Sequence, residues 1–111
     1  MSNSMDPGVD RIEKLKGFLQ ADPQDAFVKH ALALEYCKIG EDALARRLWE
    51  EILARDPAYV GSYYQLGKLL ERTGEKALAI QWYEKGIAAA KTAGDKRTFN
   101  ELQAAFEDLT D

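Results

Sequence analysis

The sequence has little of what catalysis and metal binding need. His30 is its one histidine and Cys37 its one cysteine. On a helix, seven residues would separate them by roughly 10 Å along the axis, which is beyond the hydrogen-bond reach of a nucleophile–base pair. Two such ligands are also too few for a metal site. No glycine-rich phosphate loop is present, since "GDK" at Gly94 is typical of a turn. We therefore expect no enzyme, no catalytic residue, no cofactor and no metal.

Long apolar runs and paired cysteines are also missing. No stretch is long enough to span a bilayer, and "MSNSMDPGVD" lacks the basic and apolar regions of a signal peptide. A net charge of −4 gives no general attraction to nucleic acid or to an anionic membrane. A lone cysteine favours a reduced compartment. These features predict a cytoplasmic protein whose partners are neither nucleic acid nor membrane.

Proline is scarce, with only Pro7, Pro23 and Pro57. The alternation of β-branched residues that is typical of strands is absent, and alanine, leucine, glutamate and lysine dominate. The 111 residues are enough for one domain with a buried core. We therefore expect an all-α protein.

Helix-breaking residues and several apolar residues of this sequence recur after 34 residues. The recurring positions are Asp22-Pro23 with Asp56-Pro57, Gly40 with Gly74, Leu32 with Leu66, Ala45 with Ala79, and Trp49 with Tyr83. A fixed period of this size indicates a repeat architecture. Gly40 and Gly74 divide each repeat into two helices, because glycine readily adopts the left-handed conformation that ends a helix.

The spacing within each repeat resembles the tetratricopeptide repeat (TPR), whose pattern is W-x2-L-G-x2-Y, then A-x3-F, then P. The second repeat matches with Tyr63, Leu66, Gly67, Leu70, Ala79 and Tyr83, and the first with Leu32, Ala33, Tyr36, Ala45, Trp49 and Pro57. Lys29 stands where an aromatic residue is expected, and Lys91 replaces the second closing proline. The resemblance implies a helix-turn-helix array stacked as an α-α superhelix.

The same pattern sets the expected boundaries. We predict a flexible tail over residues 1–8 and a single TPR-like domain over residues 9–111. Its about six helices are expected in an N-terminal helix at 9–21, repeat 1 at 25–56, repeat 2 at 60–92 and a C-terminal helix at 96–110. A two-residue insertion in "KTAGDK" precedes the last helix.

Gly67 lies on the apolar face of its predicted helix, although a mid-helix glycine costs about 1 kcal/mol relative to alanine. The repeat places it against the second helix of its own pair, where a small residue allows close approach. We expect Trp49, Tyr83, Tyr36, Phe99 and Phe106 to be core residues, and Trp82 to be half-exposed.

Because TPR arrays bind extended or helical peptides in a concave groove, the resemblance implies a non-enzymatic protein–protein interaction module. The predicted groove residues are Phe27, His30, Leu34, Lys38, Tyr64, Lys68, Arg72, Arg97 and Asn100. This mixture of aromatic and basic side chains suits a carboxylate-bearing peptide with an apolar anchor. Across repeats, Lys38 should lie near Arg72 and His30 beside Tyr64. The family's two-carboxylate clamp for chaperone C-termini is not reproduced, because His30 and Leu34 occupy its lysine and asparagine positions.

The alternative is a scaffold or assembly subunit that pairs through its end helices. The N-terminal segment "VDRIEKLKGFL" has an apolar stripe that a second copy could cover, which would give a homodimer.

Overall fold

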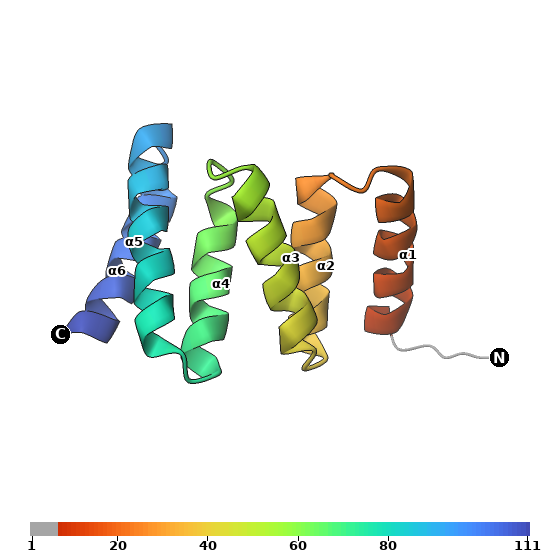
Figure 1. Ribbon diagram of the computed structural model, residues 1–111, viewed down its shortest axis with the longest axis horizontal. Coiled ribbons are helices and arrows are strands. Elements are labelled where there is room, and N and C mark those ends of the chain that lie inside the picture. Colours follow the sequence, from red (N-terminus) through yellow and green to blue (C-terminus); the bar gives the residue numbers. More distant parts are fainter. Residues whose placement is uncertain (1–6) are drawn as a thin grey trace. The chain divides into compact units, whose positions relative to one another are not determined.

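The computed structural model describes residues 7–111. Over this range the chain forms six α-helices and no strand, which confirms the predicted all-α helix-turn-helix array (Figure 1). The helices are α1 (Pro7–Ala21), α2 (Ala26–Lys38), α3 (Asp42–Arg55), α4 (Gly61–Arg72), α5 (Lys76–Ala93) and α6 (Lys96–Thr110). The described residues divide into two compact units, the first ending at Ile52 and the second running from Leu53 to Asp111.

The N-terminal helix starts earlier than predicted. Residues 1–6 of the expected tail lie outside the described range, but α1 already begins at Pro7. Proline is well tolerated at the first position of a helix, where the amide has no intrahelical acceptor.

The turns inside the helix pairs have the predicted glycine conformation. Gly40 follows α2 with φ of 82°, and Gly74 follows α4 with φ of 87°. In both turns the residue after the glycine is hydrogen-bonded to the preceding helix. The Glu41 N–H donates to the carbonyl of Tyr36 at 2.9 Å, and the Glu75 N–H donates to the carbonyl of Leu70 at 2.8 Å. These bonds satisfy carbonyl groups at the helix ends.

The "KTAGDK" insertion lengthens α5. Without the closing proline, the helix continues past Lys91 to Ala93 and ends at Gly94, whose φ is 71°. Asp95 then caps α6 by accepting hydrogen bonds from the backbone N–H of Thr98 at 3.0 Å and from its hydroxyl at 2.8 Å. The backbone bond is the main cause that lowers the pKa of Asp95.

In the first unit, α1 packs against α2. The buried cluster between them consists of Ile12, Leu15, Val28 and Leu32. An ion pair borders this cluster, with Nε of Arg11 at 3.2 Å from the carboxylate of Glu35. The N-terminal helix is therefore part of the folded unit.

In the second unit, α4 and α6 both pack against α5 (Figure 1). Gly67 of α4 faces Tyr83 of α5, where a methyl group on Gly67 would lie 2.6 Å from Cδ1 and 2.7 Å from Cζ of the ring. Gly86 of α5 has a second close contact that the sequence analysis did not identify. A methyl group there would lie 2.6 Å from Cβ of Tyr63 and 2.9 Å from Cδ1 of Leu102. Two glycines thus allow the close packing of these three helices.

The aromatic residues assigned to the core divide into two groups. Trp49 and Tyr83 are buried as predicted, whereas Tyr36, Phe99 and Phe106 are only half-buried. In α6 the fully packed side is formed by Leu102 and Ala105. Trp82 is half-buried as expected.

Candidate functional site

On α2, the predicted groove residues differ widely in exposure. Phe27 is 71% exposed, Lys38 is exposed, and Leu34 and His30 are half-buried. Phe27 therefore offers most of an aromatic side chain to a ligand.

His30 is engaged with the core of its own unit. The indole Nε1–H of Trp49 donates a hydrogen bond to Nδ1 of His30 at 3.1 Å, and the two rings are tilted with centroids 6.0 Å apart. Burial lowers the pKa of His30. A histidine Nδ1 atom that accepts a hydrogen bond carries no proton. The imidazole ring of His30 is therefore neutral in this arrangement. His30 therefore positions Trp49 rather than supplying a positive charge to a ligand.

The predicted lysine of α2 is paired within its own helix. Nζ of Lys38 lies 3.0 Å from the carboxylate of Glu35, which also binds Arg11. The Glu35 side chain is only 7% exposed, whereas that of Lys38 is 70% exposed. The lysine is therefore accessible to a ligand, although its charge is shared with Glu35.

On α4, two predicted groove residues come together with two that the prediction omitted. Nζ of Lys68 lies 6.0 Å from the centre of the Tyr64 ring and 3.5 Å from the carboxylate of Glu71. The Tyr83 hydroxyl donates a hydrogen bond to the same carboxylate. The ring centroids of Tyr64 and Tyr83 lie 6.5 Å apart. Burial, followed by the bond to Glu71, raises the pKa of Tyr83. We call Tyr64, Lys68, Glu71 and Tyr83 the α4–α5 cluster.

The remaining predicted residues are exposed. The Arg97 side chain is 90% exposed and its Nε lies 3.7 Å from the carboxylate of Glu101. Arg72 and Asn100 are exposed as well.

Intrahelical pairing of these cations was detectable in the sequence. Glu35 and Lys38, and likewise Lys68 and Glu71, are three residues apart, and Arg97 and Glu101 are four apart. Both spacings place opposite charges on one helix face. The pairs Lys38 with Arg72 and His30 with Tyr64 each join the two units, so their proximity stays a prediction.

Lys29 occupies the aromatic position of the first repeat, and its side chain fills that position. It is 9% exposed, and its Nζ lies 3.4 Å from the carboxylate of Glu51, which is itself exposed. Its alkyl chain is buried while the ammonium group reaches a surface partner, as is common for long basic side chains.

Among residues 7–111, no three histidine, cysteine, aspartate or glutamate side chains are grouped so that they could hold a metal ion. Across the same residues, none of the helices combines the length and apolar character needed to cross a bilayer.

The helix pairs, the 34-residue period and the close glycine–tyrosine packing define an α-helical repeat protein. The sequence is 31% identical to a TPR repeat-containing protein of Pseudomonas aeruginosa over 98 residues, which cover 88% of this chain and 93% of that protein. The chain belongs to the tetratricopeptide repeat family. No protein-family model matches the sequence.

Solved structures agree with this assignment. A TPR domain protein from Salinibacter ruber is 42% identical with a TM-score of 0.76, covering 79% of this chain and 89% of that one. Protein BPP2914 from Bordetella parapertussis is 29% identical with a TM-score of 0.77, covering 89% and 86%. The TPR2B domain of yeast Sti1, solved in a complex with pHsp70, has a TM-score of 0.86 over 94% and 83% of the chains. At 13% identity it shares the fold alone.

Proposed function

We propose that this protein is a non-enzymatic interaction module that binds a peptide segment of a partner protein on the first helices of its pairs, α2 and α4, and on α6. The α4–α5 cluster carries the proposal. Within one turn of α4 it presents a half-exposed ammonium group, Lys68, beside the half-buried ring of Tyr64. These are the two kinds of group that hold a carboxylate and an apolar side chain.

The intrahelical ion pairs do not prevent binding of a ligand carboxylate. An exposed ion pair contributes about 0–1 kcal/mol to stability. Lys68 can therefore leave Glu71 for a carboxylate of the ligand, or bind both carboxylates, at small cost. Lys38 is exposed as well, but its partner Glu35 is buried and also pairs with Arg11, so the same estimate does not extend to that pair. Each contact is correspondingly weak, and we expect moderate affinity that decreases as salt rises.

The partner is expected to differ from a chaperone C-terminus. The Sti1 domain, which was solved with pHsp70, is one example of a complex formed by this fold. In the present sequence His30 and Leu34 stand at the clamp positions, and His30 is bound to Trp49. A neutral imidazole and an alkyl group do not bind two carboxylates, so we expect a peptide with fewer acidic groups at this position.

The test is capture of the partner by the wild type and by Lys68→Gln/Arg72→Gln, followed by identification with mass spectrometry. Neutral replacements are preferable to glutamates, which would place a second carboxylate beside Glu71. A matched control is Arg47→Gln/Lys76→Gln, which removes the same charge from exposed positions on the second helices. We expect only the first variant to lose the partner while its melting temperature is retained. Equal capture by both variants would exclude α4 as the binding surface.

A second candidate is self-association through the end helix. In α1, Phe18 is 59% exposed and Val9 is 50% exposed. A second copy that covers them would make the protein an assembly subunit. The mass from light scattering at micromolar concentration decides: a dimer supports this candidate, and a monomer excludes it.

A further inference from the structure

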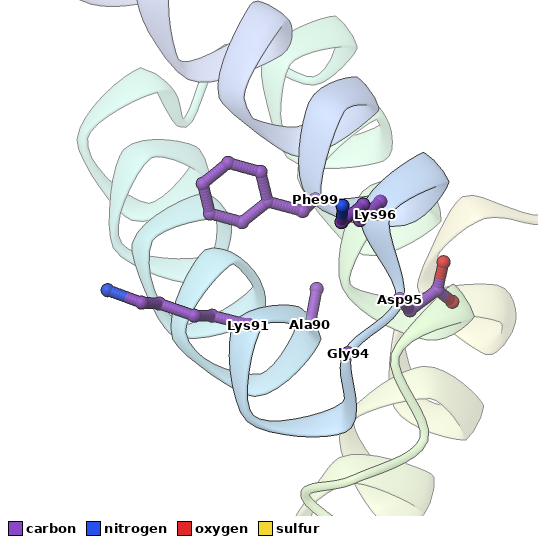
Figure 2. Close-up of a pocket in the computed structure, with 6 residues that line it drawn as sticks. All are labelled: Ala90, Lys91, Gly94, Asp95, Lys96 and Phe99. Atoms are coloured by element: carbon purple, nitrogen blue, oxygen red, sulfur yellow. The ribbon is translucent and has the colours of Figure 1, made fainter.

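An apolar cavity lies where α5 ends and α6 begins. Its volume is about 230 Å³, and it is lined by Ala90, Lys91, Gly94, Asp95, Lys96 and Phe99. The wall is almost wholly apolar. Figure 2 shows the Phe99 ring on one side and Ala90 and the stem of Lys91 on the other. Lys96 and Phe99 lie on α6, which the proposed surface includes, but none of the six lining residues is among its predicted groove residues.

The extra turn of α5 creates this cavity. Because α5 continues to Ala93 before Gly94 reverses the chain, Lys91 remains helical and extends beside the start of α6. Phe99 lies on the first turn of α6 and is half-buried, so its ring forms a wall instead of filling the space. The cavity is large enough for one aromatic or branched side chain, because an apolar cavity of about 150 Å³ can hold benzene.

The charged groups at the rim determine which segment fits. Within residues 7–111, neither Lys91 nor Lys96 has an ion-pair partner, in contrast to Lys38, Lys68 and Arg97. Asp95 is the one carboxylate of the lining, and both of its oxygens accept hydrogen bonds from Thr98. Its carboxylate points away from Phe99 and Lys91 in Figure 2. Two lysines without ion-pair partners among the described residues therefore belong to the lining of an apolar cavity.

We propose that this cavity is an anchor site for an acidic segment of a partner protein, with one phenylalanine- or leucine-sized side chain inserted beside the half-buried ring of Phe99 and the stem of Lys91. Carboxylates of the flanking residues pair with Lys91 and Lys96. The apolar side chain supplies the burial that an exposed ion pair lacks, and the two lysines select acidic over basic flanks.

The experiment uses the full chain and amidated, acetylated pentapeptides, followed by NMR on assigned backbone amides. The acidic peptide DDFDD is compared with DDADD, which lacks the anchor, and with KKFKK, which reverses the flanking charge. We expect DDFDD to shift the amides of Ala90, Gly94 and Phe99, and the other two peptides to shift them far less. Equal shifts with DDADD or with KKFKK would overturn the proposal.

Variants test the same contacts. Lys91→Gln/Lys96→Gln should weaken DDFDD binding by roughly tenfold, because the variant removes both ion pairs with the acidic flanks. Arg47→Gln/Lys76→Gln, which also removes two positive charges but from exposed residues outside the lining, is the matched control and should bind as the wild type does. Ala90→Leu fills the cavity and should abolish binding, with circular dichroism as the check on folding. If Ala90→Leu fails to fold, the lysine variants still decide the question.

Two further outcomes are informative. Shifts confined to Tyr64 and Lys68 would overturn the anchor site while supporting the surface on α4. Shifts at Gly94 that grow with protein concentration in the absence of peptide would show that a second copy occupies the cavity, which also overturns the proposal.

Discussion

The ring of Tyr83 on α5 lies directly against the backbone of Gly67 on α4, so that a single added carbon would come within 2.7 Å of its Cζ atom. Tyr83 is fully buried, and its hydroxyl group is held by Glu71. The ring therefore cannot move aside without losing both packing and a hydrogen bond.

Gly67→Ala should destabilise the protein although alanine is the better helix former. Overpacking costs about 1–3 kcal/mol, against a gain of about 1 kcal/mol in helix propensity. Gly67→Leu should be severely destabilising. The control is Gly17→Ala in α1, where an added methyl group meets nothing within 4 Å and stability should rise. Urea unfolding measures the stability of the Gly67→Ala and Gly17→Ala variants. A Gly67→Ala variant more stable than the wild type would contradict the close packing of Gly67 against Tyr83.

The bond from Trp49 to His30 predicts a pH-dependent stability. Burial lowers the pKa of His30 below its ordinary 6.5, so below that pH the unfolded chain binds a proton that the folded chain does not. The free energy of unfolding should therefore fall as the pH decreases through 6.5, and level off below the lowered pKa of the folded state.

His30→Asn is the control for this effect. Its side-chain oxygen can still accept from Trp49, but it does not titrate. Denaturant unfolding of the two proteins over the same pH range should show a slope for the wild type and a flat line for the variant. Equal slopes would assign the effect to other groups.

Tyr83 predicts a loss of stability at alkaline pH. Its pKa is raised in the folded state, so the unfolded chain loses the phenolic proton first once the pH exceeds the ordinary value of 10.0. Stability should fall above that pH, and Tyr83→Phe should make the fall shallower. At neutral pH the same variant should cost about 1 kcal/mol through the lost bond to Glu71. Tyr64→Phe keeps that bond and is the control; an unchanged alkaline slope in Tyr83→Phe would contradict the prediction.

Two apolar residues of α1 should differ in how strongly their replacement by alanine lowers stability. Leu15 is 8% exposed in the cluster with α2, and Leu15→Ala should cost about 2–5 kcal/mol. Phe18 is 59% exposed, and Phe18→Ala should change stability by no more than about 0.5 kcal/mol. Deleting residues 9–19 should lower the melting temperature further, because the partners of Leu15 on α2 become exposed. A deletion that melts like the wild type would show that α1 adds no stability.

The sequence predicted those features that recur with its period. Gly67 was identifiable because it falls on the small-residue position of a repeat, and the turns at Gly40 and Gly74 are 34 residues apart. Gly86 was not, because the position 34 residues earlier is Ile52, so nothing in the repeat indicates a close contact there. Its role arises from Tyr63 of α4, whose Cβ would lie 2.6 Å from an added methyl group, and from Leu102 of α6, whose Cδ1 would lie 2.9 Å away.

The candidate sites were less predictable. Column spacing identified Lys38 and Lys68 as groove residues, whereas the carboxylates that share their charge follow from a different pattern, the three-residue spacing within each helix. The cavity beside Phe99 depends on how far α5 continues before Gly94 reverses the chain. That length is a consequence of the missing proline at Lys91, and no local pattern encodes the space it leaves.

The two tryptophans fall one in each compact unit, Trp49 in the first and Trp82 in the second. Their surroundings differ: Trp49 is buried and bonded to an imidazole, whereas Trp82 is half-buried with Nζ of Lys85 at 4.7 Å from its ring. The fluorescence of Trp82→Phe therefore reports the unit that ends at Ile52, and that of Trp49→Phe the unit that begins at Leu53. In repeat proteins, stability is approximately a sum of unit and nearest-neighbour terms. Comparing the fluorescence midpoint of each variant with the circular-dichroism midpoint of the same variant would thus measure how cooperatively the units unfold, without any external label.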